Sequence, residues 1–236
     1  MDTTGGQATP TPAVAAVAAL HDESRRRLYE FIRCQRRPVT REEAGDALGI
    51  SRKLAAFHLD KLVAVGLLRT RIGQDTDEPK VGRRPKVYEL SGVDVRVTVP
   101  DRRHDLLAHI LVDAVVSGSA DANSHSAAIR VAHEYGVAIG TAQRREVRPG
   151  RLGAERALSL AESLLQRYGF EPSRETTTTV RLRNCPFHPV VERSPELVCA
   201  INHAFVTGLL DGLEARSAQV TLAPRVGECC VELNSR

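Results

Sequence analysis

The sequence predicts an α+β protein with an N-terminal winged helix-turn-helix domain, followed by a helical C-terminal domain with a small antiparallel sheet. Three observations carry this prediction. Residues 40–64 have the capping residues and apolar spacing of two helices joined by a tight turn. Residues 67–90 contain two short β-rich runs on either side of a basic, polar loop. Residues 101–236 combine long helical segments with shorter β-rich ones.

Composition bounds the class of protein. The chain has 236 residues, of which 42% are hydrophobic and 26% charged, as expected for two soluble globular domains. No apolar run approaches the length of a membrane span. Residues 1–20 are rich in Pro and Thr and lack a basic stretch before an apolar one, so we expect a disordered tail rather than a signal peptide. These features predict a cytoplasmic protein with no membrane partner.

The helical part of the first domain has clear start and stop signals. Residues 22–35 form an amphipathic pattern. Thr40 can cap the next helix, with Glu43 as the reciprocal partner of a capping box. Gly49 supplies the turn, and Ser51 caps a second helix. Helix, tight turn and helix therefore follow one another in the order of a DNA-reading motif.

The second helix of this motif has one apolar and one polar face. Ala55, Leu59 and Leu62 recur at spacings of four and three, so they face the core. A helix in a DNA major groove presents its outer face to base edges and phosphates, and a basic loop suits phosphate or minor-groove contact. The residues expected to contact a double-stranded DNA operator are Ser51, Arg52, Lys53, Ala56, Phe57, His58 and Lys61, followed by Arg83, Arg84 and Lys86 from the loop and the next strand.

The second domain begins with two helical segments, at residues 101–117 and 124–147. The first is apolar enough to be buried or to form a dimer seam. Because one winged domain reads few base pairs, we expect a homodimer on two half-sites. Two further helices are predicted at 154–168 and 194–215, and β-rich segments at 176–183 and 218–233.

Cysteines gather at the end of the chain. Four of the five, Cys185, Cys199, Cys229 and Cys230, lie at the expected edges of helices and strands, where separate segments can converge. Clustered thiols in a cytosolic chain indicate metal or redox chemistry, and thiolates select zinc, copper(I) or iron–sulfur clusters. His188 is an alternative fourth ligand.

Two questions about these cysteines stay open from the residues alone. Neighbours in a regular strand point to opposite faces, so Cys229 and Cys230 can share one centre only where the chain bends. The thiols could also be small buried hydrophobic residues, or a redox dithiol without metal.

The winged domain, the segment GRRPKVYEL and the pattern NCPFH…LVC…N…GLL.GL…G.CC together resemble ArsR-like winged-helix regulators related to the SufR repressors. The resemblance covers about residues 20–235. It implies a homodimer that binds a palindromic operator, senses iron–sulfur status and holds a 2Fe-2S or 4Fe-4S cluster through C-terminal cysteines. By position, Cys185 and Cys199 match the first two ligand cysteines, and Cys229 or Cys230 the last.

The chain departs from this family at one position. Relatives carry a further cysteine near residues 213–215, and this sequence has none. The ligand set and cluster type are therefore open, and the alternative is a winged-helix regulator that senses zinc or a small apolar ligand. An enzyme is not expected, because the chain has no Gly-rich phosphate loop, GxSxG or HExxH motif.

The expected organisation is then as follows: a disordered tail at 1–20, a winged helix-turn-helix DNA-binding domain at 21–91, a linker at 92–100, and a dimerisation and cysteine-containing sensor domain at 101–236.

Overall fold

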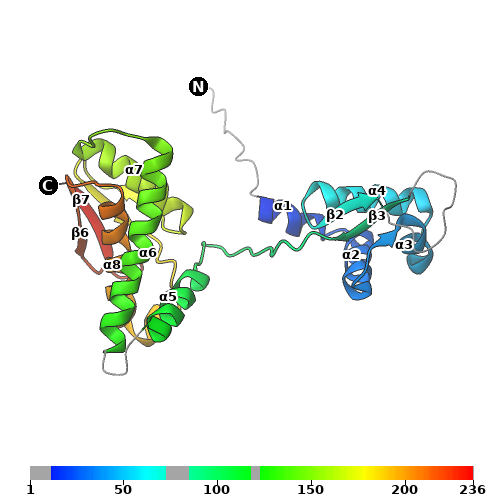
Figure 1. Ribbon diagram of the computed structural model, residues 1–236, viewed down its shortest axis with the longest axis horizontal. Coiled ribbons are helices and arrows are strands. Elements are labelled where there is room, and N and C mark those ends of the chain that lie inside the picture. The colour runs from blue at the N-terminus through cyan, green and yellow to red at the C-terminus, as the bar shows by residue number, and fades with distance from the viewer. Residues whose placement is uncertain (1–11, 73–84, 118–122, 236) are drawn as a thin grey trace. The chain divides into compact units, whose positions relative to one another are not determined.

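The computed structural model describes residues 12–72, 85–117 and 123–235. The chain forms two compact units, Met1–Val97 and Thr98–Arg236, each with its own apolar core (Figure 1). The two units contain helices and two small antiparallel sheets, which confirms the mixed α and β prediction. Within the described residues, no helix is both long and apolar enough to span a bilayer.

Within residues 12–72 and 85–97, the N-terminal unit packs four helices with a three-stranded antiparallel sheet of strand order β1-β3-β2. Its strand β1 has only two residues and was not predicted, because so short a strand exists only by pairing with β3. In chain order the elements are α1 (Pro12–Ala19), α2 (Glu23–Gln35), β1 (Val39–Thr40), α3 (Arg41–Leu48), α4 (Arg52–Ala64), β2 (Leu68–Ile72) and β3 (Lys86–Leu90).

The predicted caps position α3 and α4. The Thr40 hydroxyl accepts from the Glu43 amide at 3.2 Å, and the Glu43 carboxylate accepts from the Thr40 amide at 2.7 Å. Gly49 ends α3 with φ of 68°, a left-handed conformation that suits glycine. Ser51 then accepts from the Leu54 amide and starts α4. These local bonds fix where α4 begins, and therefore which of its residues face outward.

The prediction that residues 1–20 form a disordered tail is wrong for residues 12–19. These residues form α1, and Ala16 is buried in the first core. The reason is the run of alanines, which have the highest helix propensity, and Pro12 at the first position, where its missing N–H costs nothing. Residues 1–11 lie outside the described part of the chain.

In its described residues, the C-terminal unit combines four α-helices and one 3₁₀-helix with an antiparallel sheet of order β4-β5-β7-β6. Strand β4 and the 3₁₀-helix were not predicted, although the α-helices and the other strands were expected close to where they lie. In chain order the elements are α5 (His104–Ser117), α6 (Ser124–Val147), α7 (Ala154–Arg167), β4 (Pro172–Arg174), β5 (Thr179–Leu182), the 3₁₀-helix η1 (Val190–Arg193), α8 (Pro195–Gly212), β6 (Ala218–Leu222) and β7 (Val231–Ser235).

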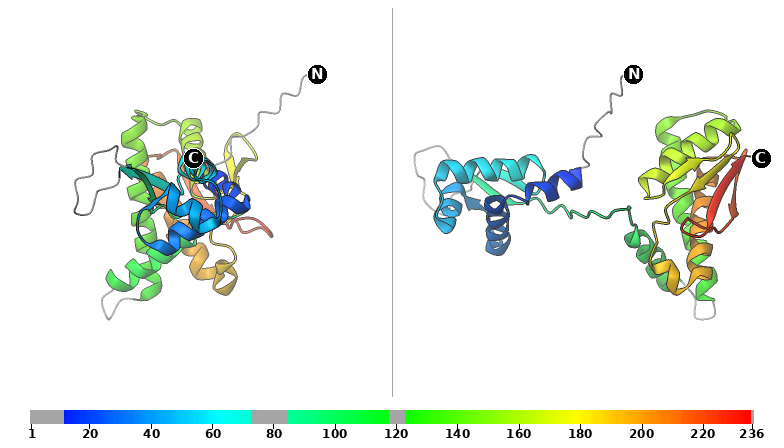
Figure 2. Two further views of the ribbon diagram at one scale, coloured as in Figure 1. Left: turned by 90° about the vertical axis from the view of Figure 1, so that its right-hand side faces the viewer. Right: turned by 180° about the vertical axis from the view of Figure 1, so that it is seen from behind.

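Helices α6 and α8 lie side by side and in the same direction (Figures 1 and 2). Their contact is made by four glycines. A methyl group on Gly136 would lie 2.1 Å from the Phe205 carbonyl oxygen, and one on Gly208 would lie 2.1 Å from that of His133. Gly140 and Gly212 continue the same close contact one turn along. The two backbones therefore touch, and α6 fixes the position of α8.

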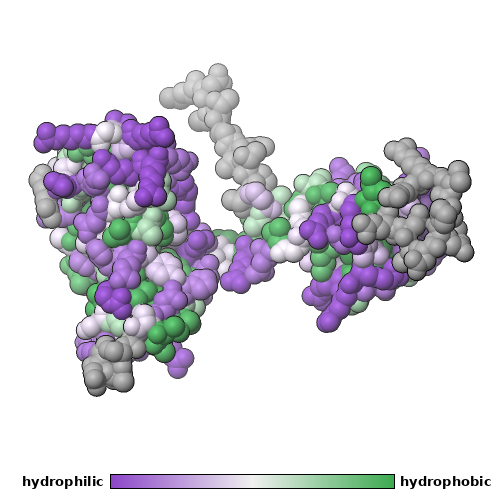
Figure 3. Space-filling view, viewed as in Figure 1, coloured by the Kyte–Doolittle hydropathy of each residue, from purple (hydrophilic) through white to green (hydrophobic). Residues whose placement is uncertain are grey.

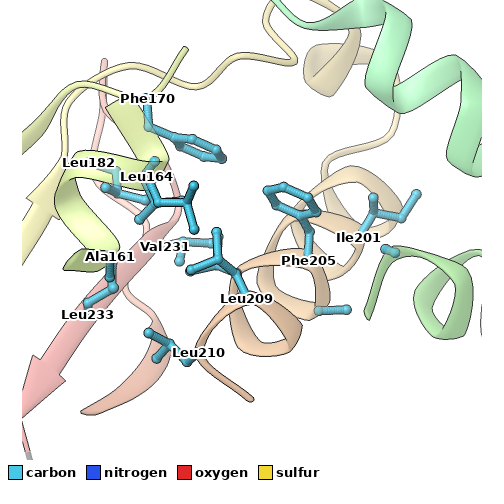
Figure 4. Close-up of a cluster of buried hydrophobic side chains, with 14 of the residues drawn as sticks. Ala161, Leu164, Phe170, Leu182, Ile201, Phe205, Leu209, Leu210, Val231 and Leu233 are labelled. Carbon is cyan, nitrogen blue, oxygen red and sulfur yellow. The ribbon is translucent and has the colours of Figure 1, made fainter. Parts of the chain in front are cut away.

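Helices α7 and α8 pack on the sheet through a large apolar core (Figure 4). The rings of Phe170 and Phe205 are stacked with centroids 6.5 Å apart, beside Leu209, Val231 and Leu233. Burying each such side chain contributes about 1.5–3 kcal/mol. This core holds together the three segments that carry the C-terminal cysteines.

Candidate functional site

Four cysteines come from three segments of the C-terminal unit. Cys185 lies in the turn after β5, and Cys199 lies in the second turn of α8. Cys229 and Cys230 end the connection between β6 and β7. That connection is bent at Cys230, and β7 begins only at Val231. The alternation of a regular strand therefore does not apply to the pair.

The four sulfurs lie in one continuous row. Cys229 is the neighbouring thiol that most raises the pKa of Cys185, and Cys230 in turn raises the pKa of Cys229, so these sulfurs are neighbours in that order. Cys230 is also the neighbouring thiol that lowers the pKa of Cys199, so Cys199 completes the row. Cys229 and Cys230 are buried, and Cys185 and Cys199 are half-buried. We refer to these four residues as the thiol centre.

Burial and neighbouring thiols raise the pKa of Cys185, Cys199 and Cys229. The neighbouring Cys229 thiol and burial both raise the pKa of the Cys185 thiol. Burial raises the pKa of Cys199. For Cys229, the Cys185 thiol lowers the pKa, but the Cys230 thiol and burial outweigh it and raise the pKa to about 12. An opposing positive charge would be needed to ionise this centre at neutral pH.

A buried arginine shapes the loop that carries two of the cysteines. Arg181 of β5 is fully buried, and its guanidinium contacts the Glu228 and Glu232 carboxylates at 3.1 and 2.9 Å. It also donates to the Ala223 carbonyl at 2.9 Å. The Cys229 amide donates to the Leu182 carbonyl at 2.9 Å. These bonds attach both ends of the loop to β5.

The thiol centre also receives an amide donor from α8. The Asn202 side-chain nitrogen donates to the Cys229 sulfur at 3.1 Å, and Asn202 is fully buried. Its amide oxygen is buried without a hydrogen-bond partner. Neither Asn202 nor Arg181 was predicted as a site residue, because their partners lie tens of residues away in sequence. A charged residue between two apolar strand positions was the one available signal for Arg181.

A pocket of about 510 Å³ opens beside the thiol centre and gives access to it. Cys185, Cys199 and Cys230 line it, together with Arg102, Arg183 and His188. The exposed His188 ring pairs with Glu192 at 2.8 Å. The predicted alternative ligand His188 is thus near the cysteines but bonded to Glu192, and the fourth sulfur in the row belongs to Cys230.

The thiol centre has the donor atoms of a metal site but not the arrangement of one. Across residues 12–72, 85–117 and 123–235, no three His, Cys, Asp or Glu side chains are arranged to hold a metal ion as they stand. The donor chemistry nevertheless fits, since four neighbouring thiols are the ligand type of iron–sulfur clusters and of structural zinc. Binding would require the sulfurs to lose their protons.

The outer face of α4 in the N-terminal unit is exposed and carries basic and aromatic residues. Lys53, Phe57 and Lys61 follow one another at i, i+4 and i+8. Phe57 is 53% exposed, unusual for so large an apolar side chain, and the Lys61 ammonium lies 5.6 Å from the centre of its ring. Ser51 and Arg52 are also exposed, and Ala56 is half-buried.

Ion pairs occupy two of the predicted DNA contacts. The Arg52 guanidinium lies 2.8 Å from the Glu42 carboxylate. The Lys86 ammonium lies 2.6 Å from Asp60, which also accepts from the Tyr88 hydroxyl at 3.0 Å. The bond with Asp60 raises the pKa of Lys86. Because Lys86 neutralises the one acidic residue on the outer face of α4, the remaining charge there is positive.

One predicted DNA contact lies on the wrong face, and two lie outside the described residues. His58 is 7% exposed and belongs to the buried side of α4, three residues after Ala55 and four before Leu62. Its Nδ1 lies 3.8 Å from an Asp22 carboxylate oxygen. His58 therefore packs α4 against the start of α2. Arg83 and Arg84 fall in residues 73–84, which the structure does not describe.

No protein-family model matches this chain, and no curated protein sequence matches it either.

Proposed function

We propose that this protein is a DNA-binding transcription regulator of the winged helix-turn-helix class, acting as a repressor. In this proposal α3 and α4 are the helix-turn-helix, and α4 is the recognition helix. Strands β2 and β3 are the sides of the wing. The observation that carries the proposal is the exposed row of Lys53, Phe57 and Lys61 on α4, directly after a capped turn. Such a face suits base edges and phosphates in a major groove.

The test of this half of the proposal is sequence-selective DNA binding. Full-length protein would be used to select duplexes from a random-sequence pool, and the enriched sequence would be measured by gel shift. We expect one enriched motif with two half-sites, and binding that weakens as salt rises. Binding equal to that of a scrambled duplex would exclude sequence-specific regulation.

We further propose a homodimer with α5 in its seam. Helix α5 exposes Val112, Val115 and Val116, at 58%, 75% and 80%. Figure 3 shows hydrophobic surface over this helix. A dimer presents two recognition helices to two half-sites about one DNA turn apart. Light scattering should give twice the mass of the 25.8 kDa chain. A monomer at micromolar concentration, with and without the selected duplex, would exclude the dimer.

The second half of the proposal concerns regulation. Cys185, Cys199, Cys229 and Cys230 would hold an iron–sulfur cluster whose presence changes operator affinity. A bound cluster would supply redox and iron-responsive chemistry at this place. The chain itself supplies four sulfurs from three segments, an amide donor from Asn202 and an open pocket. Protein purified under nitrogen should be brown and contain iron and sulfide; a colourless, iron-free protein would exclude the cluster.

Zinc is the second candidate for the same centre, favoured by the close row of four sulfurs. A zinc protein would be colourless with about one metal ion per chain. Elemental analysis of the anaerobic protein therefore decides between the two metals.

A further inference from the structure

The turn that carries Cys185 is hydrogen-bonded to the first residues of the C-terminal unit. We call residues 184–188 the Cys185 turn, and residues 101–104 the entry segment. They are separated by more than eighty residues in sequence. The Arg103 amide of the entry segment donates to the Pro186 carbonyl at 2.8 Å. The His104 ring nitrogen lies 2.9 Å from the His188 carbonyl oxygen, so the contact continues to the start of α5.

Two side chains strengthen this contact. Asn184 is 6% exposed and donates to the carbonyls of Asp101 and Gly169. Its side-chain oxygen accepts from the Arg102 guanidinium. The same guanidinium nitrogen lies 3.2 Å from the Cys185 carbonyl oxygen. Two of the three side-chain hydrogen bonds of Asn184, those with Asp101 and Arg102, therefore fix the entry segment next to Cys185.

The entry segment lies between α5 and the connection to the N-terminal unit, so this contact constrains both. On one side the entry segment continues into α5, which begins at His104. On the other side, residues 91–100 form no helix or strand and lead back to β3 of the N-terminal unit. A displacement of the Cys185 turn must move the entry segment or break its hydrogen bonds. Movement of the entry segment would shift α5 and the connection to the first unit, and loss of its hydrogen bonds would release both of them.

We propose that Arg102 and Asn184 are positioning residues that transmit the state of the thiol centre to α5 and to the connection with the N-terminal unit. This inference rests on the proposed function for its effect on DNA, but the transmission itself can be observed without DNA. Arg102 lines the pocket beside Cys185 and Cys199 and contacts the Cys185 carbonyl, so a shift of Cys185 acts on Arg102 directly.

The experiment uses full-length reduced protein and Cd²⁺ alone, a thiolate-seeking ion that does not depend on which metal the protein holds in the cell. Hydrogen–deuterium exchange would be followed in residues 98–107, with and without Cd²⁺. The Arg103 amide reports directly on the bond to Pro186. We expect Cd²⁺ to change exchange in this segment about fivefold or more, and to change affinity for the selected duplex by a similar factor.

The test variant is Arg102→Met, which keeps the aliphatic stem and removes the donors. We expect it to bind Cd²⁺ as the parent does, while both Cd²⁺ responses fall below about twofold. The matched control is Arg156→Met, which loses the same charge from an exposed side chain of α7, outside the entry segment and the Cys185 turn. If Arg102→Met does not fold, His104→Ala replaces it, since His104 is exposed and also bonds the Cys185 turn.

The outcomes separate this inference from the proposed function. Parent-like Cd²⁺ responses in Arg102→Met would overturn the role of Arg102. The role of Arg102 would also be overturned if the parent binds Cd²⁺ but exchange in residues 98–107 does not change. It would likewise be overturned if Cd²⁺ does not bind. An exchange response in the parent that Arg102→Met loses, without any change in DNA affinity, would support the transmission and instead refute the proposed regulation of DNA binding.

Discussion

The Asn202 side-chain nitrogen lies 3.1 Å from the Cys229 sulfur, inside a fully buried environment. A carboxamide N–H is a better partner for an ionised sulfur than for a neutral thiol, because hydrogen bonds to charged acceptors are stronger. The unpaired Asn202 oxygen has no compensating bond. Burying a polar group at this cost indicates that Asn202 serves the sulfur rather than the stability of α8.

Asn202→Leu should therefore weaken metal binding without unfolding the protein. Residues that hydrogen-bond to a metal ligand without touching the metal typically contribute ten- to a hundredfold to metal affinity. We therefore expect the affinity for Cd²⁺ to fall by about this factor. The unfolding transition should change little, because leucine of similar volume also removes the unpaired oxygen. Gln166→Leu, at an exposed position of α7, is the matched control. Equal Cd²⁺ affinity in both variants would show that the Asn202 bond is incidental.

Metal binding by the thiol centre should depend steeply on pH. The pKa values of Cys185, Cys199 and Cys229 are all raised, so these groups are protonated in the free protein at neutral pH. A metal must displace those protons, and its apparent affinity must therefore rise as pH rises. We expect at least three protons released per ion bound, one from each of these thiols. Calorimetry in two buffers of different ionisation enthalpy measures the number; release of none would contradict the protonated state.

The parts of the fold that follow from neighbouring residues were predictable. The Thr40–Glu43 capping box and the αL residue Gly49 depend on contacts within four residues, and the structure has both. Strands β1 and β4 were missed because two or three residues have no pattern of their own. The helical state of α1 was missed because Pro and Thr before it suggested a tail, although alanine dominates its own sequence.

The thiol centre was predictable only as a set of residues. Clustering and residue type identified Cys185, Cys199, Cys229 and Cys230, and the structure brings all four together. Their arrangement was not predictable, because it depends on the bend before β7. That bend is held by Arg181, whose acidic partners Glu228 and Glu232 lie on another strand and its loop. One consequence is that both Cys229 and Cys230 are in the row, so alternation along a strand no longer restricts the centre to one of them.

The contact between α6 and α8 should tolerate no added side chain. A methyl group on Gly208 would lie 2.1 Å from the His133 carbonyl oxygen, and backbone cannot move away as a flexible side chain can. Gly208→Ala should reduce the free energy of unfolding by about 1–3 kcal/mol or more, as overpacked cores do. Urea denaturation followed by circular dichroism measures it. Gly153→Ala is the control, since nothing lies within 4 Å of the added group; a similar small effect in both would contradict the close contact.

The salt dependence of DNA binding should identify phosphate contacts on α4. Lys53→Ala should weaken binding to the selected duplex and reduce the slope of log affinity against log salt by about 0.9, if its ammonium neutralises one phosphate. Arg52→Ala should weaken binding less, because Glu42 already pairs with that guanidinium at 2.8 Å. Arg156→Ala, an exposed arginine of α7, controls for net charge. If both α4 variants give the same slope of log affinity against log salt as the parent, α4 is excluded from the DNA interface.

The exposed ring of Phe57 should contact the methyl group of a thymine. Apolar side chains on a recognition helix contact the C5-methyl group of thymine in the major groove, and Phe57 lies between Lys53 and Lys61 on the outer face. Replacing single thymines of the selected duplex by deoxyuridine removes only that methyl group. At one position in each half-site, we expect this change to cost the parent about fourfold in affinity, the value of one buried methyl group.

Phe57→Ala should bind the unmodified duplex more weakly and should show no further loss with deoxyuridine at that position. Val93→Ala, another exposed apolar residue outside α4, should respond to deoxyuridine as the parent does. The two substitutions thus form a cycle in which the coupling belongs to one ring and one methyl group. If deoxyuridine weakens Phe57→Ala and the parent equally at every position, the ring does not contact a thymine methyl. The exposed Phe57 ring would then have to contact a different group.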